Sequence, residues 1–335
     1  MNYRTLGRTG LSVSEVAFGC GSVGGVLVRG NHDEQIETVS RAMEMGINYF
    51  DTAPGYGDGL SETNLGHVLA ELHVDDVTVA TKVRLSADDL KDTIGSVQRS
   101  LETSLKRLRR DSIDILQLHT QVSLDRSNPD WQRTLDVKDV LGKGGVADAF
   151  DKMCSQGLIR FLGFTGVGET SALHQVVDSG RFDLLQVYYN LLNPSAGLSM
   201  PPQFTGYDFR QLIDAASEHD LGVVVIRVMA GGALGGTPVR PRNASPTVDV
   251  VISGNTYEVN KAKAEKLNTL VSGDVDSLPQ AALRFTLIHP GVSTVLVGFS
   301  SLAQIEEAVI GADKGPLPVS AMDHLRDIWA VNFRV

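Results

Sequence analysis

Residues 47–57, INYFDTAPGYG, decide the fold of this chain. An apolar, β-rich run ends in Asp51, a Pro-Gly turn follows, and Tyr56 comes five positions after the acid. Similar runs, apolar on both faces, recur along the chain and are separated by segments with helical periodicity. The eight runs are residues 15–19, 47–51, 77–82, 113–119, 159–166, 182–190, 222–228 and 293–298.

The alternation of strand and helix predicts a parallel sheet covered by helices. The clearest helical segment is 89–109, where apolar residues recur at steps of three and four. Its stripe consists of Leu90, Ile94, Val97, Leu101, Leu105 and Leu108. Eight strand-helix units match the (β/α)8 TIM barrel better than an open sheet, so we expect residues 1–335 to form one barrel domain.

Other segments of the chain are interpreted from their place in this barrel. Residues 3–14 contain a Gly-Arg-Thr-Gly turn and predict a β-hairpin that caps the bottom. Residues 120–137 and 231–257 follow the fourth and seventh strands and are too long for ordinary connections, so we expect functional loops at one barrel face. Residues 319–335 predict a short helix and a tail able to close over that face.

Composition restricts the partners of the protein. The chain has 335 residues, a formal net charge of -10 and 42% hydrophobic content, which argues against a nucleic-acid or anionic-membrane surface. Two cysteines, Cys20 and Cys154, exclude a disulfide framework and show no metal-ligand spacing. No apolar run approaches the ~20 residues of a membrane span. We therefore expect a cytoplasmic protein without a metal, a monomer or weak homo-oligomer, that binds a small molecule.

Titratable residues end three successive strands, at the barrel face where active sites of this fold lie. These residues are Asp51, Lys82 and His119, and Tyr56 lies in the loop after Asp51. Taken singly, a strand-end Asp can cap a helix, a Lys can be solvated and a His can be structural. Taken together, they are not what packing requires. The four residues are the candidate catalytic set.

This set has a mechanism that needs no metal. A phenol titrates near ~10, and a neighbouring cation favours the phenolate. Lys82 could supply that charge, Asp51 could pair with Lys82, and His119 could hydrogen-bond the substrate oxygen or relay a proton. The set predicts proton transfer at a carbonyl or carbinol carbon.

Several of these motifs resemble those of the aldo-keto reductase superfamily. The specific pieces are LGRTGLSVSEVAFG, GINYFDTAPGYGDGLSETNLG, VATK and IDILQLH, and GLIRFLGFTG, LLQVYYN and STVLVGFSSLAQIEEA extend the likeness over almost the whole chain. The resemblance implies Asp51, Tyr56, Lys82 and His119 as the family tetrad. Tyr56 would be the general acid and base, and hydride would pass between nicotinamide C4 and the substrate carbon.

The resemblance also implies a cofactor site at the other strand ends. Thr165 and Gln186 would hydrogen-bond the nicotinamide carboxamide, and Arg227 would stack on its ring. Gly166 replaces an Asn of many relatives, and FTG (164–166) is similar to sugar-oxidising members, the NAD-linked L-galactose and L-fucose (aldose) dehydrogenase group. The full predicted cofactor set is Gly19, Cys20, Asp51, Thr165, Gln186, Arg227, Val228, Ala230, Gly232, Val297, Phe299, Ser300, Gln304 and Glu307.

Residues 297–308, VGFSSLAQIEEA, predict which nicotinamide dinucleotide is used. They contain no Lys or Arg, and Phe299 and Gln304 stand where relatives that prefer NADP place cations. Glu306 and Glu307 follow, and a carboxylate near the adenosine ribose favours a free 2'-hydroxyl. We expect NAD to be favoured, with NADP as the alternative.

Two glycine-rich stretches imitate other nucleotide motifs. GCGSVG (19–24) fits G-x-G-x-x-G, but a Rossmann motif opens a helix directly, whereas GVLVRGN intervenes before a helix expected near Asp33. We interpret 19–24 as a loop at the rim of the first strand. GGALGG (231–236) lacks the Gly-Lys-Ser/Thr ending of a P-loop and is expected along the pyrophosphate.

The predicted substrate pocket combines rim residues and the catalytic pair. Its expected walls are Val23, Leu27, Tyr56, His119, Trp131 and Trp329, with Phe333 as an alternative to Trp329; either tryptophan could instead pack a lid. Aromatic content of 6% does not indicate a steroid-type pocket. Glycines and polar residues in the rim loops suit a hydroxylated, sugar-like substrate.

Competing functions remain open at this point. The leading hypothesis is an NAD-linked aldose or sugar-like alcohol dehydrogenase, and the alternative is a broad-specificity aldehyde or ketone reductase using NADPH. A nucleotide-sensing regulatory subunit of the same fold belongs to another class, and fold alone does not exclude it. A barrel enzyme for phosphorylated substrates would use the glycines of 231–236 but gives the tetrad no role.

Overall fold

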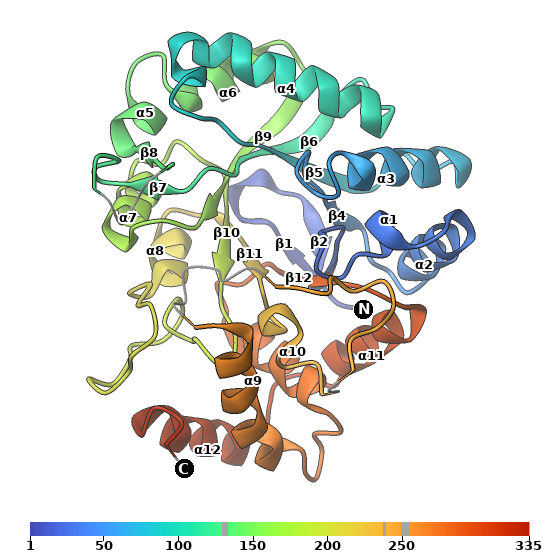
Figure 1. The fold of residues 1–335 in the computed structure, drawn as a ribbon, viewed down its shortest axis with the longest axis vertical. Coiled ribbons are helices and arrows are strands. Elements are labelled where there is room, and N and C mark those ends of the chain that lie inside the picture. The colour runs from blue at the N-terminus through green and yellow to red at the C-terminus, as the bar shows by residue number, and fades with distance from the viewer. Residues whose placement is uncertain (129–132, 237–238, 249–254, 335) are drawn as a thin grey trace.

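Eight parallel strands close into a barrel in the computed structural model, which describes residues 1–128, 133–236, 239–248 and 255–334. Neighbouring strands follow the order β10-β11-β12-β3-β4-β5-β6-β9, and helices surround them (Figure 1). The predicted (β/α)8 fold is confirmed. The barrel strands are β3 (Val16–Gly19), β4 (Tyr49–Asp51), β5 (Thr78–Val83), β6 (Ile113–Leu118), β9 (Ile159–Gly166), β10 (Leu184–Tyr188), β11 (Gly222–Ile226) and β12 (Thr294–Gly298).

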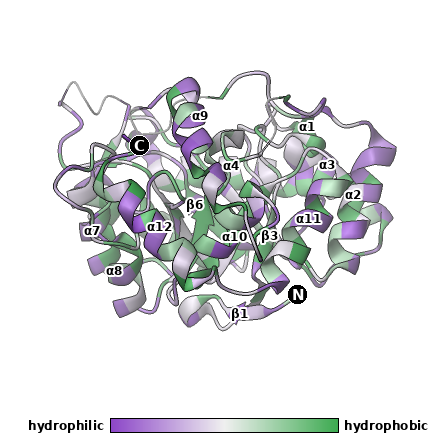
Figure 2. Cartoon of the chain, turned by 90° about the horizontal axis from the view of Figure 1, so that it is seen from below, coloured by the Kyte–Doolittle hydropathy of each residue, from purple (hydrophilic) through white to green (hydrophobic). Residues whose placement is uncertain are grey.

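The helices turn apolar stripes toward the barrel and polar faces toward solvent (Figure 2). In α4, Val97, Leu101, Leu105 and Leu108 are buried, whereas Ile94 in its first turn is 40% exposed. The helices are α1 (Val26–Arg29), α2 (His32–Glu44), α3 (Leu60–Glu71), α4 (Thr93–Leu108), α5 (Val137–Leu141), α6 (Val146–Ser155), α7 (Thr170–Asp178), α8 (Leu212–Glu218), α9 (Tyr257–Lys266), α10 (Leu278–Ile288), α11 (Leu302–Asp313) and α12 (Val319–Ala330).

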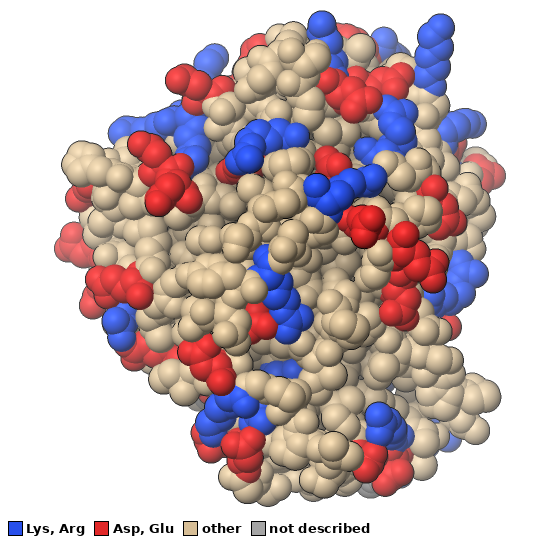
Figure 3. Space-filling model, turned by 180° about the vertical axis from the view of Figure 1, so that it is seen from behind, with Lys and Arg blue, Asp and Glu red and all other residues tan. Residues whose placement is uncertain are grey.

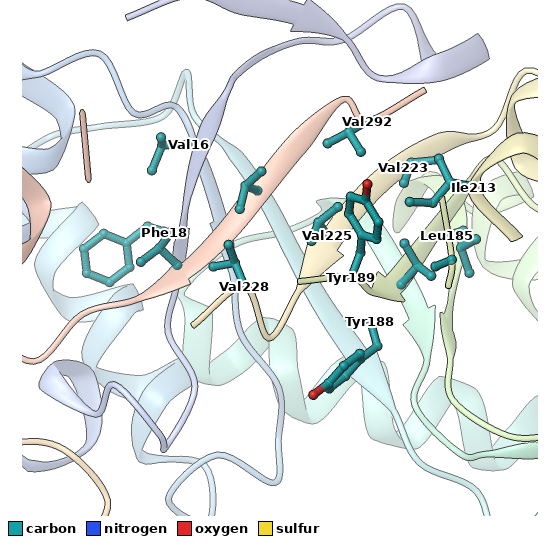
Figure 4. Packing of buried hydrophobic residues seen from close by; sticks show 14 of the residues in the cluster. Val16, Phe18, Leu185, Tyr188, Tyr189, Ile213, Val223, Val225, Val228 and Val292 are labelled. Carbon is teal, nitrogen blue, oxygen red and sulfur yellow. The ribbon is translucent and has the colours of Figure 1, made fainter. Parts of the chain in front are cut away.

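Two apolar cores hold this arrangement together. The larger one lies between the strands and the helices, where strand residues such as Leu185 and Val223 pack near Ile213 of α8 (Figure 4). The smaller one fills the lower barrel with Tyr49, Ile115, Leu184 and neighbours. Burial of these side chains supplies the main driving force for folding.

The predicted N-terminal hairpin is present and closes the bottom of the barrel. Strand β1 (Tyr3–Thr5) pairs antiparallel with β2 (Ser12–Ser14). Leu6 and Val13, both fully buried, join the apolar cluster inside the lower barrel. The opposite end of the barrel is therefore the end that remains free to hold a site.

The two long connections expected to be loops differ in form. After β6, two short strands, β7 (Val122–Ser123) and β8 (Leu135–Asp136), pair in parallel, so this stretch is partly regular. After β11, the short 3-10 segment Ala230–Gly232 leads into a stretch without helix or strand among its described residues, up to α9. Both connections leave the carboxyl ends of the strands.

The surface shows no face of a single charge in the view of Figure 3, where basic and acidic side chains are interspersed. Within the ranges that the structure describes, no helix is long and apolar enough to cross a membrane.

Candidate active site

All four residues of the predicted catalytic set line one cavity at the carboxyl ends of the strands. Asp51 is the last residue of β4, Lys82 lies in β5, His119 follows β6, and Tyr56 lies in the turn between β4 and α3. The cavity has a volume of about 790 Å³. Because parallel strands end at the same face, residues up to 68 positions apart converge there.

A buried ion pair forms the floor of this cavity. Lys82 Nζ pairs with the Asp51 carboxylate and donates a hydrogen bond to Thr52 O at 2.8 Å, and each charged side chain is 1% exposed. Burial acts to lower the pKa of Lys82, but the charges and hydrogen bonds of Asp51 and Tyr56 outweigh it and raise that pKa. Lys82 is therefore an ammonium at neutral pH.

Two amides complete the hydrogen bonding of the Asp51 carboxylate. Gln117 Nε2 and Gln186 Nε2 donate to Asp51 Oδ2 at 2.8 Å and 2.5 Å. Gln186, predicted as a carboxamide ligand, thus contacts Asp51 as well as lining the cavity. Hydrogen bonds to the charged form stabilise a buried carboxylate.

Tyr56 and His119 lie above the ion pair and face one another. Their ring centroids are 6.0 Å apart with the planes at 85°, and Lys82 Nζ lies 4.8 Å from the Tyr56 ring centroid. Burial, and then the positive charges of Lys82 and Arg84, lowers the pKa of His119 to about 3. His119 is therefore a neutral imidazole that can hydrogen-bond a substrate oxygen but carries no charge.

The arrangement supports proton transfer to or from an oxygen held between the phenol and the imidazole. Tyr56 is the group able to donate the proton as a phenol or accept it as a phenolate, and the Lys82 ammonium stabilises the phenolate. Asp51 keeps Lys82 in place. The chain thus supplies acid-base chemistry for a carbonyl or a carbinol.

The rest of the cavity fits a nicotinamide dinucleotide. Thr165 Oγ1 is buried in the cavity wall and has no hydrogen-bond partner among the described residues, so it can serve an amide of a ligand. At Gly24 an added Cβ would lie 2.4 Å from the backbone of Gly298, so only glycine allows this close approach at the rim. The lining of the cavity also includes Gln186, Gln304 and Glu307.

Residues 239–248 form a strap that ties the connection after β11 to the opposite rim. Ser245 N donates to Val23 O at 3.0 Å, Arg29 Nε donates to Asn243 O at 2.8 Å, and Asn243 Nδ2 donates to Ser300 O at 3.3 Å. Val239, Arg240, Pro241 and Ala244 of the strap line the cavity. This connection forms a wall of the cavity, to which Gly231, Gly232 and Gly235 contribute.

Most of the predicted cofactor residues lie in the cavity wall. They are Gly19, Asp51, Thr165, Gln186, Arg227, Val228, Gly232, Val297, Ser300, Gln304 and Glu307. Cys20, Ala230 and Phe299 are buried and do not line it, so their contact with a cofactor stays a prediction. The Phe299 ring turns outward and packs on Phe18 with centroids 5.2 Å apart, and the Cys20 thiol faces Phe18 O.

The residues predicted as substrate walls differ in whether they line the cavity. Val23, Tyr56 and His119 line the cavity, but Leu27 and Trp329 are buried in the core and do not. Trp329 Nε1 donates to Leu191 O at 2.9 Å, and its ring packs edge-on against Phe285, which places α12 beside the barrel. Phe333 is buried beneath Lys263, and Trp131 lies outside the described residues.

Gln117, Arg84 and Arg240 are among the polar residues at the site that escaped the sequence reasoning. Gln117 precedes His119 by two positions, so both side chains point into the barrel, but the apolar residues around Gln117 conceal this in the sequence. Arg84 follows Lys82 by two positions and lines the mouth of the cavity. Arg240 has no local signal. Its guanidinium lies 5.0 Å from the Tyr257 ring centroid, Nη2 donates to Gly231 O at 3.1 Å, and Nε is buried without a partner among the described residues.

The lowered pKa of His119 predicts a pH dependence of stability. A histidine of the unfolded chain titrates near ~6.5, whereas His119 in the folded protein titrates at about 3. As the pH falls through this window, the unfolded chain binds a proton that the folded protein does not, so the free energy of unfolding decreases. Urea unfolding at about pH 7.5 and about pH 5 should show a larger decrease for the wild type than for His119→Gln. Equal decreases would contradict the assignment of a neutral, buried imidazole.

Comparison with known proteins agrees with this geometry. The L-galactose dehydrogenase of Arabidopsis thaliana is 31% identical over 315 residues, which cover 91% of this chain and 86% of that protein. The D-threo-aldose 1-dehydrogenase of a Pseudomonas species is 28% identical over 331 residues, 89% of each chain. The structure of the aldo-keto reductase AKR11C1 from Bacillus halodurans in its holo form superposes with a TM-score of 0.73 at 24% identity, covering 99% of this chain and 97% of that one, and it supports the fold.

A family model also covers nearly the entire barrel. The model of the aldo/keto reductase family matches residues 15–330. Members of this family use nicotinamide cofactors and act on CH-OH or carbonyl groups. Together with the cavity that unites Asp51, Tyr56, Lys82 and His119, the match shows that this chain is an oxidoreductase belonging to the aldo-keto reductase family.

Proposed function

We propose that this enzyme is an NAD-linked dehydrogenase of aldoses or sugar-like alcohols. The observation that carries the proposal is the part of the cavity wall that α11 contributes, where Glu307 and Gln304 are the polar side chains. Residues 296–308 contain no Lys or Arg. A carboxylate at this wall favours a ribose 2'-hydroxyl and repels a 2'-phosphate.

The two neighbouring glutamates of α11 have different surroundings. Glu307 Oε1 accepts a hydrogen bond from Ser277 Oγ at 2.7 Å, and the residue lines the cavity. Glu306 points away and forms an ion pair with Arg41 of α2 at 2.9 Å. Of the two acids, Glu307 is the one that lines the cavity, which supports it as the residue that acts on a cofactor.

In the oxidative direction the chain's own groups handle the proton. A bound nicotinamide supplies the hydride acceptor. Tyr56 as phenolate accepts the proton of the substrate hydroxyl, the Lys82 ammonium stabilises that phenolate, and neutral His119 fixes the substrate oxygen. In the reverse direction Tyr56 donates the proton. The direction in the cell follows from the cofactor ratio and is not set by these residues.

The catalytic end of the cavity suits a hydroxylated substrate. Gln121, Arg84 and Ser22 contribute polar groups to the wall, and among the described lining residues the phenol rings are those of Tyr56 and Tyr257. The two relatives named for sugar oxidation cover most of this chain. These two observations support an aldose over a flat aromatic or steroid substrate. We place this activity in the cytoplasm, in a monomer or weak homo-oligomer.

A reductase that uses NADPH is the second candidate, and Arg240 is the observation that favours it. This guanidinium lines the cavity and keeps a buried, unpartnered Nε among the described residues, so it could bind a 2'-phosphate. Its contact with Gly231 O places it beside the glycines expected along the pyrophosphate, and we assign it to the pyrophosphate instead.

Steady-state kinetics with both cofactors tests the proposal. We expect oxidation of L-galactose and related aldoses with kcat/KM for NAD exceeding that for NADP by roughly tenfold or more, since hydrogen bonds to charged groups are worth about 1.5–3 kcal/mol. Glu307→Gln should reduce this preference, whereas the matched control Glu306→Gln should leave it unchanged. A clear preference for NADPH, or activity confined to aldehydes such as nitrobenzaldehyde, would overturn the proposal in favour of the reductase.

Substitution of Tyr56 tests the assigned acid and base. Tyr56→Phe removes the hydroxyl and should lower kcat by ~10²–10⁴-fold, while the affinity for the cofactor changes little. Turnover and cofactor fluorescence titration measure the two effects. Retention of more than about a hundredth of the wild-type rate would be incompatible with general acid-base catalysis by Tyr56.

A further inference from the structure

We propose that Gln117 is a positioning residue of the reaction. Gln117 holds the Asp51 carboxylate toward Lys82 and disperses the negative charge of that carboxylate, even when Gln186 binds another group. The proposal rests on the oxidoreductase chemistry of the family and on Tyr56 as its acid and base, and it is independent of the preference for NAD or sugars.

Gln117 belongs to a polar layer that crosses the barrel below the cavity. Asp51, Gln117 and Gln186 come from β4, β6 and β10, which alternate around the barrel as the strands of one interior layer do. Each follows by two positions an apolar residue of the lower barrel, Tyr49, Ile115 or Leu184 respectively, so all three point inward. The barrel interior is thus apolar up to this layer and polar within it.

The neighbouring strand is built to admit the glutamine. Gln117 pairs in register with Lys82 on one side and with Gly163 on the other. A Cβ at Gly163 would lie 2.8 Å from Gln117 Cγ, so the glycine leaves the volume that the amide side chain occupies. The side chain is 0% exposed.

The two amides that reach Asp51 Oδ2 have different surroundings. Gln186 lines the cavity and is available to a bound ligand, whereas Gln117 is not among the residues that line it. Gln117 donates to the carboxylate at 2.8 Å, and its Oε1 is buried without a partner among the described residues. If Gln117 only filled space, an apolar side chain of the same size would be less costly, because it would leave no buried carbonyl without a hydrogen bond.

The hydrogen bond from Gln117 to Asp51 affects the phenol of Tyr56 through the charge of Lys82. The positive charge of Lys82 favours the phenolate of Tyr56. The negative charge of Asp51 opposes this effect, and the opposition is weaker when hydrogen-bond donors disperse the charge of the carboxylate. Loss of the Gln117 donor leaves a more concentrated negative charge behind Lys82. The phenolate of Tyr56 is then less favoured, and the oxidative reaction needs a higher pH to reach its full rate.

Two variants of Gln117 and one control separate this role from packing. Gln117→Met keeps the length and removes the donor, and Gln117→Glu keeps the shape and adds a second carboxyl beside Asp51. Gln35→Met is the control: Gln35 is a buried glutamine of α2, 4% exposed, whose Nε2 donates to Gly30 O at 2.8 Å. The kcat and KM of wild type and variants are measured across pH for L-galactose oxidation and for nitrobenzaldehyde reduction.

We expect Gln117→Met to lower kcat for oxidation by roughly tenfold or more at neutral pH, as for a hydrogen bond to a charged group, with KM within about twofold. The rising limb of the kcat profile should move to higher pH in Gln117→Met, and less in Gln117→Glu, because, of two carboxyl groups that share a buried site, one stays protonated and can still donate a hydrogen bond to the other. Gln35→Met should match the wild type in kcat and in its pH profile.

Other results overturn the proposal. Unchanged kcat and an unmoved pH profile in both Gln117 variants would do so, as would a fall in kcat without any shift of the profile. If both Gln117 variants fail to fold while Gln35→Met folds, Gln117 is a structural residue only. A wild type that reduces nitrobenzaldehyde but oxidises no aldose would refute the proposed sugar function, and the same comparison of variants on nitrobenzaldehyde would still decide the role of Gln117.

Discussion

A buried ion pair between Asp51 and Lys82 is the constraint on which the mouth of this barrel depends. Removing two charges from water costs several kcal/mol per ion unless each finds partners. The surrounding strands provide them: Thr52 O accepts from Lys82, and Gln117 and Gln186 donate to Asp51. Below this polar layer the barrel is filled by apolar side chains, and above it lies the cavity.

The ion pair also helps to determine which side chains of the site carry a charge and which stay neutral. Lys82 remains an ammonium next to the Tyr56 ring, while His119, which is buried beside the positive charges of Lys82 and Arg84, stays neutral. This supports our proposal that Tyr56 moves the proton and that His119 fixes the substrate oxygen. The proposed division of roles would let one site reduce a carbonyl or oxidise an alcohol without rearranging its charges.

Local pattern explains why the sequence predicts the barrel and the convergence of Asp51, Tyr56, Lys82 and His119 on one cavity. The eight strands and the hairpin follow from short apolar runs and turn residues, and parallel strands necessarily bring Asp51, Lys82 and His119 to one face. Whether a residue near the rim lines the cavity depends on the direction of its side chain, which its position in the sequence does not determine. Leu27 and Trp329 turn into the core, and Glu306 and Glu307 differ because successive helical residues point about 100° apart.

Residues that act from beneath the cavity are hardest to find in a sequence. Gln117 stands in the apolar run IDILQLH and looks like an ordinary strand position, yet the register places it against Asp51. Arg240 lies in an irregular connection, where no periodicity indicates its direction. The roles of both residues become apparent only in the structure, where segments far apart in the chain lie side by side.

Deuterium tracing tests the central claim most directly, that this site moves hydride between a sugar carbon and a nicotinamide while Tyr56 handles the proton. L-Galactose deuterated at C1 is oxidised in ordinary water with NAD. The account predicts that the deuterium appears at C4 of the reduced nicotinamide and that kcat/KM falls relative to the undeuterated sugar. Reduced cofactor without deuterium, or deuterium lost to water, would contradict it.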